Sequence, residues 1–228
     1  MDAEFWHRKW AREEIGFHEN EVNPLLIEHF VELAQEQDSR IFLPLCGKTL
    51  DIHWLLSEGY RVVGVELSRS AVEQLFDELG VEPAVSSRGP FEWFSGPGVD
   101  IFVGDFFELS SAILGRVDAI YDRAALVALP PAMRERYAAR LVDITAHAPQ
   151  LLICFEYDQA LMNGPPFAVE GAEVARHYEG CYRLRQLGHV EIPGGFKGRI
   201  PAAERVWLLQ AGALGSVQTP NGQPGQPA

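Results

Sequence analysis

Cysteines and basic residues are both scarce in this chain of 228 residues. The three cysteines, Cys46, Cys154 and Cys181, are far apart and form no Cys-x-x-Cys pair, which excludes a disulfide framework and a zinc knuckle. The 19 Lys and Arg residues face 32 Asp and Glu residues, so the net charge is −13. Binding of duplex nucleic acid or of an anionic membrane depends on a Lys/Arg surface, and this composition argues against both. We expect a small-molecule ligand instead.

Long apolar runs are missing as well. No stretch approaches the ~20 apolar residues that a membrane-spanning helix requires. The N-terminus, Met1-Asp2-Ala3-Glu4, has neither the basic nor the apolar part of a signal peptide. The chain does contain 47% hydrophobic residues, which is enough to fill a core. We therefore predict a cytoplasmic protein that acts as a monomer, without a nucleic-acid or membrane partner.

Apolar runs typical of strands alternate with helical patterns from residue 40 onward. Strands are predicted at 40–43, 61–65, 100–103, 117–121 and 151–155. This alternation is typical of a doubly wound parallel sheet with helices on both faces. Two longer runs, 181–190 and 205–210, are joined by a loop that contains Gly and Pro, and they predict an antiparallel pair at the sheet edge.

Helix starts can be predicted from capping residues. Asn23 followed by Pro24 predicts the start of a helix before the first strand. Thr49 is the expected cap of the next helix. Ser70 with Glu73 has the spacing of a capping box for the helix after the second strand.

The pattern divides the chain into three parts. Residues 1–39 precede the first strand and form an N-terminal helical segment. Residues 40–211 contain the predicted sheet. Residues 212–228 are rich in Gly, Pro, Gln and Ser with almost no apolar side chains, which predicts a disordered tail.

Ligands of an open parallel sheet bind outside the carboxyl ends of its strands. A turn that contains Gly47 follows the first strand, and Glu66 follows the second strand, 19 residues after Gly47. A carboxylate at about this distance from a turn glycine binds the ribose of an adenosine cofactor, because one carboxylate can accept both hydroxyl hydrogen bonds. A solvated loop carboxylate is the alternative interpretation of Glu66.

The turn after the first strand also resembles a phosphate-binding loop at Gly47-Lys48-Thr49. The glycine that such a loop needs five residues before Gly47 is Phe42, however, so its cradle of backbone amides is incomplete. The Gly-x-Gly-x-x-Gly fingerprint of dinucleotide-binding proteins is incomplete as well, because only one of its glycines is present in this turn. We expect a cofactor without phosphate, and a nucleotide-dependent phosphotransferase remains an alternative.

Polar side chains also follow the third and fourth strands. Asp105 can accept a hydrogen bond from an adenine amino group, and Phe106 can pack on the ring, although a turn aspartate and a core aromatic would look the same. Asp122 and Arg123 are expected to emerge from the fourth strand as a surface ion pair. Such a pair contributes little to stability, so its position where a reacting group would lie is the informative feature.

Four segments of the chain, taken in order, match one known family. They are Phe42-Leu43-Pro44-Leu45-Cys46-Gly47-Lys48, Val63-Gly64-Val65-Glu66, Asp122-Arg123-Ala124-Ala125-Leu126-Val127 and Gly164-Pro165-Pro166-Phe167. These segments resemble the thiopurine S-methyltransferase family, and the resemblance runs from Trp6 to about Gln210. It implies an α/β fold of the Rossmann-like class I methyltransferase type, with a mostly parallel seven-stranded sheet, helices on both faces and an antiparallel C-terminal strand pair. It also implies that 1–39 is a lid, that 40–211 is the methyltransferase domain and that the cofactor is S-adenosyl-L-methionine.

The resemblance assigns roles to individual residues. The cofactor-binding residues that it implies are Trp10, Leu45, Gly47, Glu66, Asp105, Phe106 and Arg123. The substrate-binding residues that it implies are Phe17, Arg123 and Arg199. Arg123 is the implied catalytic residue, and no metal is implied. The segment 81–98 departs from the animal relatives and leaves the acceptor open.

The function that the resemblance implies is direct in-line methyl transfer to a small aromatic or heterocyclic thiol such as a thiopurine. Selenium and tellurium compounds are further acceptors, because related bacterial members are associated with their methylation. A general base is not strictly needed when an acidic thiol arrives ionised, and a guanidinium such as that of Arg123 or Arg199 favours the ionised form. A phosphotransferase that uses residues 47–49 and a non-catalytic cofactor-binding sensor are the alternatives.

Overall fold

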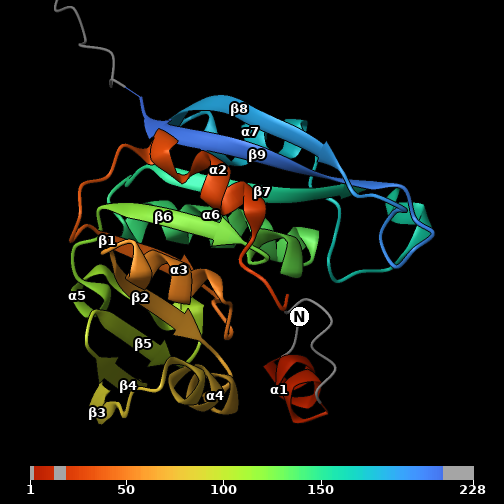
Figure 1. The fold of residues 1–228 in the computed structure, drawn as a ribbon. Helices are drawn as coiled ribbons and strands as arrows, with labels where there is room; N and C mark the ends of the chain where they lie inside the picture. The colour runs from red at the N-terminus through yellow and green to blue at the C-terminus, as the bar shows by residue number, and fades with distance from the viewer. Residues whose placement is uncertain (1–2, 13–18, 213–228) are drawn as a thin grey trace, which may run out of the picture.

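The computed structural model describes residues 3–12 and 19–212, whose strands form one nine-stranded sheet in the order β3-β4-β5-β2-β1-β6-β7-β9-β8. Figure 1 shows this sheet with helices in front of it and behind it. The central strands run parallel and are β5 (Val99–Val103), β2 (Arg61–Glu66), β1 (Arg40–Pro44), β6 (Ala119–Arg123) and β7 (Gln150–Tyr157). This arrangement confirms the predicted mostly parallel, Rossmann-like sheet.

Both edges of the sheet are antiparallel. At one edge β9 (Ala202–Ala211) pairs with β7, and β8 (Tyr182–Glu191) pairs with β9, which confirms the predicted C-terminal strand pair. At the other edge β3 (Ala84–Arg88) and β4 (Phe91–Gly96) form a hairpin on β5. The predicted count of seven strands was wrong because of this hairpin. Most of the β3 side chains are exposed, so the strand has no apolar pattern by which the sequence could reveal it.

Helices cover both faces of the sheet and bury two apolar cores. One core lies under α2 (Pro24–His29), α3 (Asp51–Ser57) and α4 (Arg69–Leu79), and the other lies under α5 (Ser111–Leu114), α6 (Pro131–Ile144) and α7 (Gly171–Tyr178). Four 3-10 turns in the described residues complete the chain: η1 (Phe30–Leu33), η2 (Phe106–Glu108), η3 (Leu126–Ala128) and η4 (Gln159–Leu161). Helix α1 (Ala3–Ala11) lies beside α4, beyond the arrowhead of β2 (Figure 1).

Two of the three predicted helix caps lie elsewhere. The Asn23 side chain accepts a hydrogen bond from the Leu25 amide at 2.8 Å, which confirms the start of α2. Helix α4 is capped by Ser68 rather than by Ser70, because β2 ends at Glu66 and leaves Ser68 extended with its Oγ facing the Ala71 amide. Helix α3 begins after Leu50 instead of Thr49, although the Thr49 hydroxyl accepts a hydrogen bond of 3.3 Å from the Asp51 amide.

The predicted strand 117–121 is displaced by two residues in the structure. Strand β6 begins at Ala119 and ends at Arg123, so Asp122 and Arg123 lie within the strand. Successive side chains of a strand point to opposite faces, and these two neighbours therefore point apart.

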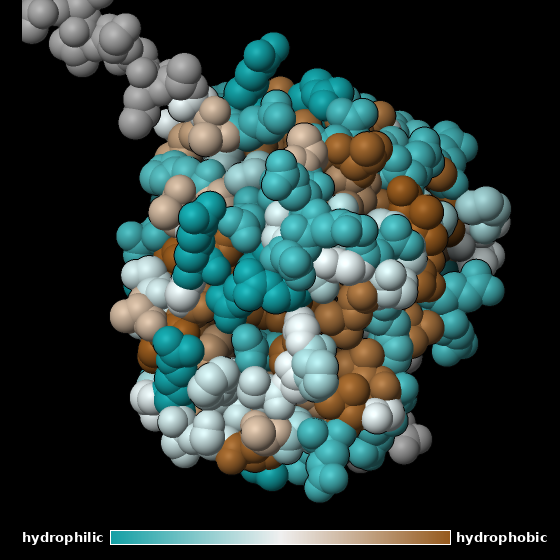
Figure 2. Space-filling model, turned by 60° about the vertical axis from the view of Figure 1, so that its left-hand side comes forward, coloured by the Kyte–Doolittle hydropathy of each residue, from teal (hydrophilic) through white to brown (hydrophobic). Residues whose placement is uncertain are grey.

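The surface of the described residues carries few large apolar side chains. Figure 2 shows one face, on which hydrophilic residues dominate and hydrophobic residues gather in limited patches. Among residues 3–12 and 19–212, no helix has the length and hydrophobicity needed to cross a membrane. Phe17 and the predicted tail from residue 213 onward lie outside the described residues.

Candidate active site at the carboxyl ends of the strands

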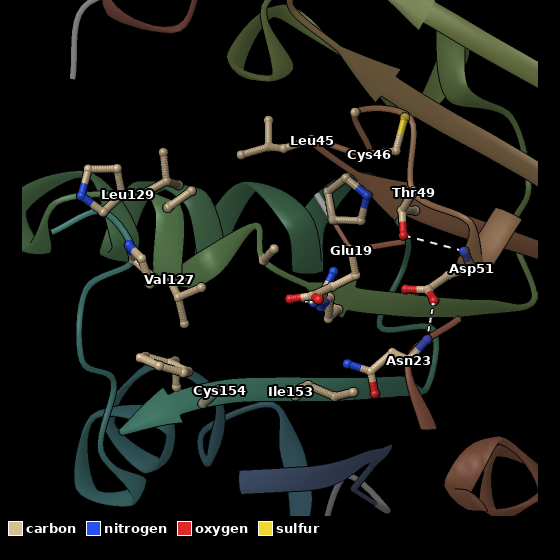
Figure 3. A pocket seen from close by; sticks show the side chains of 18 of the residues that line it. Glu19, Asn23, Leu45, Cys46, Thr49, Asp51, Val127, Leu129, Ile153 and Cys154 are labelled. Carbon is tan, nitrogen blue, oxygen red and sulfur yellow. Dashed lines mark hydrogen bonds and ion pairs between the residues drawn. The ribbon is translucent and has the colours of Figure 1, made fainter. Parts of the chain in front are cut away.

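A cavity of about 1040 Å³ opens where the parallel strands end. Its walls come from the segments that follow β1, β2, β5 and β6, from β7, from α1, and from the β8–β9 hairpin. Figure 3 shows part of it, with Leu45 and Cys46 on one wall, Val127 and Leu129 on another, and Glu19 between them. Ligand pockets commonly reach about 300–1,000 Å³, so this cavity has room for two reactants.

The turn after β1 is held in an unusual conformation. Leu45 and Gly47 both have positive φ angles, 48° and 54°. The Gly47 amide donates a hydrogen bond of 2.9 Å to Oε2 of Glu66, and the Cys46 amide donates one of 3.1 Å to the Val65 carbonyl. The turn is therefore tied to the end of β2, and the predicted pair Gly47 and Glu66 is brought together.

Glu66 is buried, with 6% of its surface exposed, yet it lines the cavity. Its other oxygen, Oε1, accepts a hydrogen bond of 2.9 Å from the Ser68 amide. Burial raises the pKa of the Glu66 carboxyl, and the amides of Ser68 and Gly47 partly offset that rise. Each carboxylate oxygen can accept more than one hydrogen bond, so both keep capacity for a ligand hydroxyl. Glu66 is therefore not a solvated loop carboxylate, which was the alternative interpretation.

Helix α1 contributes aromatic side chains to the cavity. Trp10 is buried, and a Cβ atom placed on Gly47 would lie 3.2 Å from its Cζ2 atom. The Trp10 ring therefore packs directly on the turn after β1, where only a glycine leaves it room. Phe5 and Trp6 line the same side of the cavity.

Asp105 and Phe106 line the wall that follows β5. Asp105 is exposed, and its Oδ1 accepts a hydrogen bond of 2.9 Å from the Phe107 amide as the cap of η2. The Phe106 ring is buried and packs on the Tyr137 ring with centroids 4.8 Å apart. Asp105 thus has the contacts of a turn aspartate, and Phe106 has those of a core aromatic. Both residues also face the cavity.

Arg123 extends into the cavity from the end of β6, with 12% of its side chain exposed. Its Nη2 atom lies 3.4 Å from Oε1 of Glu19, whose side chain is 61% exposed. Glu204 of β9 lines the cavity nearby; burial raises the pKa of its carboxyl, and the charge of Arg123 lowers it in part. An ion pair with so exposed a partner is weak, about 0–1 kcal/mol, and a ligand can replace it at little cost.

Asp51 is a buried carboxylate of the cavity wall that sequence reasoning missed. It accepts hydrogen bonds from the Asn23 amide at 2.8 Å and from the Tyr121 hydroxyl at 3.0 Å. Figure 3 shows the bond to Asn23 and places both residues beside Thr49. The partners come from segments far apart in sequence, so no local signal could have revealed the group.

The predicted surface pair of Asp122 and Arg123 was wrong. Asp122 is completely buried and points away from Arg123, toward α6. Its carboxylate accepts hydrogen bonds from the Tyr137 hydroxyl at 2.7 Å and from the Leu126 amide at 3.2 Å. The two-residue displacement of β6 is the reason, because it places Asp122 inside the strand rather than after it.

The wall opposite the acidic groups is apolar. Val127, Ala128 and Leu129 follow β6, and Met133 lies at the start of α6. The remaining apolar residues of this wall are Phe155, Met162, Pro165, Pro166, Ile192 and Phe196. Cys46 and Cys154 also line the cavity, but burial raises the pKa of both thiols well above the usual value, so both remain protonated.

Arg199 is not brought to this cavity. It is exposed and lines a second hollow, between the β8–β9 hairpin and the end of β7, together with Glu156 and Arg205. Among the described residues, no three His, Cys, Asp or Glu side chains lie close enough together to hold a metal ion.

Comparison with known proteins agrees with this geometry. The family model described as thiopurine S-methyltransferase matches residues 1–203. The chain belongs to the thiopurine S-methyltransferase family. A thiopurine S-methyltransferase of Xanthobacter autotrophicus is 54% identical over 211 residues, which cover 92% of this chain and 99% of the relative. One of Teredinibacter turnerae is 51% identical over 209 residues, with 92% and 97% covered.

Solved structures support the fold of this thiopurine S-methyltransferase family member. A SAM-dependent methyltransferase of Anabaena variabilis matches with a TM-score of 0.62 at 16% identity, covering 91% of this chain and 95% of that one. The 1,6-didemethyltoxoflavin-N1-methyltransferase of Burkholderia thailandensis, solved with S-adenosylhomocysteine, matches with a TM-score of 0.62 at 15% identity, covering 91% and 87%. The class I methyltransferase fold is thereby confirmed.

The family membership confirms that the protein is a S-adenosylmethionine-dependent methyltransferase. The residues of the cavity fit such a cofactor on structural grounds. The turn at Gly47 presents backbone beside an aromatic ring, and the adjacent Glu66 carboxylate has acceptor capacity toward the cavity. A buried carboxylate next to a close-approach glycine is the arrangement that binds the ribose of an adenosine group.

Proposed function

We propose that the protein methylates the sulfur of small aromatic or heterocyclic thiols, including thiopurines, by direct transfer from S-adenosylmethionine. The observation that carries this proposal is the division of a single cavity into two ends. One end has the buried Glu66 carboxylate beside the Gly47 turn, and the other has an apolar wall at residues 127–129. Arg123 lies in the same cavity. Its guanidinium can favour the ionised form of an acidic thiol.

In this proposal the cofactor is held by residues of four segments. Glu66 accepts hydrogen bonds from the ribose hydroxyls, Leu45 and Gly47 support the nucleoside from below, and Trp10 covers it. Asp105 and Phe106 lie at the adenine. S-adenosylmethionine supplies, when bound, a methyl group on a positively charged sulfur atom. Phe17 is the further acceptor contact that the resemblance predicts, whereas Arg199, which it also predicts, lines the second hollow.

The residues at the acceptor end do three things. Arg123 favours the thiolate form of the acceptor, because an opposite charge nearby stabilises an anion. The apolar wall and the aromatic side chains of α1 exclude water, which strengthens electrostatic interactions inside the cavity. The shape of the cavity orients both reactants, and fixing two reactants in this way can contribute about 7–11 kcal/mol to catalysis. No covalent intermediate on the enzyme is required.

A methyl-transfer assay tests the proposal directly. Labelled S-adenosylmethionine is offered with a series of aromatic thiols, with aliphatic thiols, and with selenite and tellurite. We expect transfer to aromatic thiols, increasing with their acidity, and selenium and tellurium compounds are the additional acceptors to be compared. Binding of the cofactor without transfer to any acceptor would instead support the sensor alternative.

A further inference from the structure

We propose that Asp122 is a positioning residue for the acceptor end of the cavity, where its carboxylate holds Arg123 and the apolar wall 127–129 in one arrangement. Arg123 and this wall are consecutive parts of one short segment after β6. Asp122 lies outside the cavity and contacts neither reactant. The inference rests on the proposed function, because Arg123 acts on the acceptor there.

The Asp122 carboxylate holds the turn that follows Arg123. Its Oδ1 atom accepts a hydrogen bond of 3.2 Å from the Leu126 amide, and the Ala125 amide also donates to the carboxylate. Between them and Arg123 lies Ala124, whose φ of 63° is unfavourable for a residue with a Cβ atom. A turn that contains such a residue persists only when neighbouring contacts stabilise it. Asp122 supplies these contacts.

The second carboxylate oxygen connects the turn to the body of the protein. Oδ2 accepts a hydrogen bond of 2.7 Å from the Tyr137 hydroxyl of α6 and one of 3.4 Å from Gln150 Nε2 of β7. Asp122, Tyr137 and Gln150 are all completely buried. The turn is therefore joined through one side chain to a helix and to the next strand.

The turn carries a large part of the acceptor end. Arg123 precedes it, Ala124 lies within it, and the side chains of 127–129 follow it along the cavity wall. The Val127 carbonyl accepts a hydrogen bond of 2.7 Å from the Phe167 amide, next to the Gly164-Pro165-Pro166 segment that forms another part of that wall. If the turn relaxed, both the guanidinium and the apolar wall would move.

The hydrogen-bond partners of Asp122 are all neutral donors. The titratable groups that face it are Tyr137 on α6, Tyr178 on α7 and Cys154 on β7, and burial raises the pKa of each of them well above its usual value. The charges of Glu173 and Arg134 act on Cys154, where Glu173 raises its pKa and Arg134 lowers it. Burial raises the pKa of Asp122 itself to about 6. Protonation would replace an acceptor by a donor, which the two amides and the Tyr137 hydroxyl cannot all match.

The test uses Asp122→Asn, which keeps the shape and removes the charge, and Tyr137→Phe, which removes a donor to Asp122 in a different way. Tyr182→Phe is the matched control, because Tyr182 is also buried and its hydroxyl donates to the Ala148 carbonyl, away from the turn. Each variant is measured for kcat/KM with a thiol that is ionised at every pH used, for cofactor affinity by calorimetry, and for hydrogen exchange of the Leu126 amide.

We expect both Asp122→Asn and Tyr137→Phe to lower kcat/KM for the acceptor by about tenfold or more, with a change in cofactor affinity of less than about threefold. The Leu126 amide should exchange faster in Asp122→Asn. Activity of the wild type should fall as the pH drops through about 6, and this inflection should be absent from Asp122→Asn. Tyr182→Phe should behave as the wild type.

Unchanged Leu126 exchange in Asp122→Asn overturns the proposal, and so does a loss of kcat/KM that cofactor affinity fully accounts for. The proposal is also overturned if Tyr137→Phe has the same kcat/KM for the acceptor as Tyr182→Phe. A wild-type protein that methylates none of the acceptors is a separate result that overturns the proposed function. In that case the Leu126 exchange rates still decide whether Asp122 holds the turn.

Discussion

The Gly47 amide and the Glu66 carboxylate are joined by a buried hydrogen bond of 2.9 Å, although the two residues are 19 positions apart in the chain. This bond fixes the distance between the turn after β1 and the end of β2. It also orients the carboxylate, whose second oxygen is held by the Ser68 amide. The end of the cavity where we propose that the ribose binds is thus preorganised by the backbone of two strand ends.

Replacing Glu66 by Gln should weaken S-adenosylmethionine binding. The amide side chain places an N–H group against the amide of Gly47 or of Ser68, and it removes the charge that strengthens a hydrogen bond to a hydroxyl. A hydrogen bond to a charged group is worth about 1.5–3 kcal/mol, which corresponds to roughly 10- to 150-fold in Kd. Calorimetric titration measures this change, and thermal unfolding controls for loss of structure. Wild-type affinity in a folded variant would reject the ribose assignment.

Replacing Gly47 by Ala should weaken cofactor binding by displacing Trp10. The new Cβ atom would lie 3.2 Å from Cζ2 of Trp10, and a φ of 54° is unfavourable for alanine. Trp10→Phe removes the ring atoms that clash, so the double variant should lose less affinity than the sum of the single changes. A double-mutant cycle on the cofactor Kd measures this coupling. Strictly additive losses would show that Trp10 and Gly47 act independently.

Replacing Arg123 by Ala should lower kcat/KM for an acidic thiol more than it lowers cofactor affinity. In the proposed function the guanidinium stabilises the thiolate, and losing one charged contact costs about 1.5–3 kcal/mol, or roughly 10- to 150-fold. The loss should be largest below the pKa of the thiol. Arg199→Ala is the comparison, because Arg199 lines the second hollow. A larger effect of Arg199→Ala than of Arg123→Ala would reverse the two assignments.

Replacing Lys48 by Met should leave methyl transfer nearly unchanged, because we expect Lys48 to bind no nucleotide. The Lys48 ammonium lies 2.6 Å from Oε1 of Glu78, so it is engaged by a carboxylate rather than directed at a phosphate. Calorimetry with ATP and Mg²⁺ should give no heat with the wild type or with the variant. Saturable ATP binding that disappears in Lys48→Met would support the phosphotransferase alternative.

Asp122 should make the free energy of unfolding depend on pH. Burial raises its pKa from 3.8 to about 6, so between these values the folded chain holds a proton that the unfolded chain has released. The stabilising contribution is complete below about pH 4 and is lost as the pH rises through about 6. It amounts to roughly 3 kcal/mol.

Urea unfolding of the wild type and of Asp122→Asn at a series of pH values measures this contribution. The difference between the two curves removes the effects of all other carboxyl groups. We expect the wild type to lose stability relative to the variant between about pH 4 and pH 6. Parallel curves across this range would contradict the raised pKa of Asp122.

Much of the architecture could be predicted from local patterns in the sequence. The order of the seven predicted strands, the cap at Asn23 and the C-terminal strand pair depend on periodicity and on short-range signals, and all three are confirmed. The spacing of Gly47 and Glu66 is also a local signal, because only a helix, a turn and a strand of ordinary length separate them. The β3–β4 hairpin escaped prediction because most of its β3 side chains are exposed.

Only the tertiary structure decided which polar groups share the cavity and which lie beneath it. Strand β6 lies two residues later in the chain than predicted. Asp122 is therefore a buried acceptor for Tyr137 and Leu126 rather than the expected surface charge. Asp51 found its partners Asn23 and Tyr121 through contacts across 28 and 70 residues of chain. The physical reason is that strand register and long-range packing determine where a side chain points. Neither can be predicted from the neighbouring residues alone.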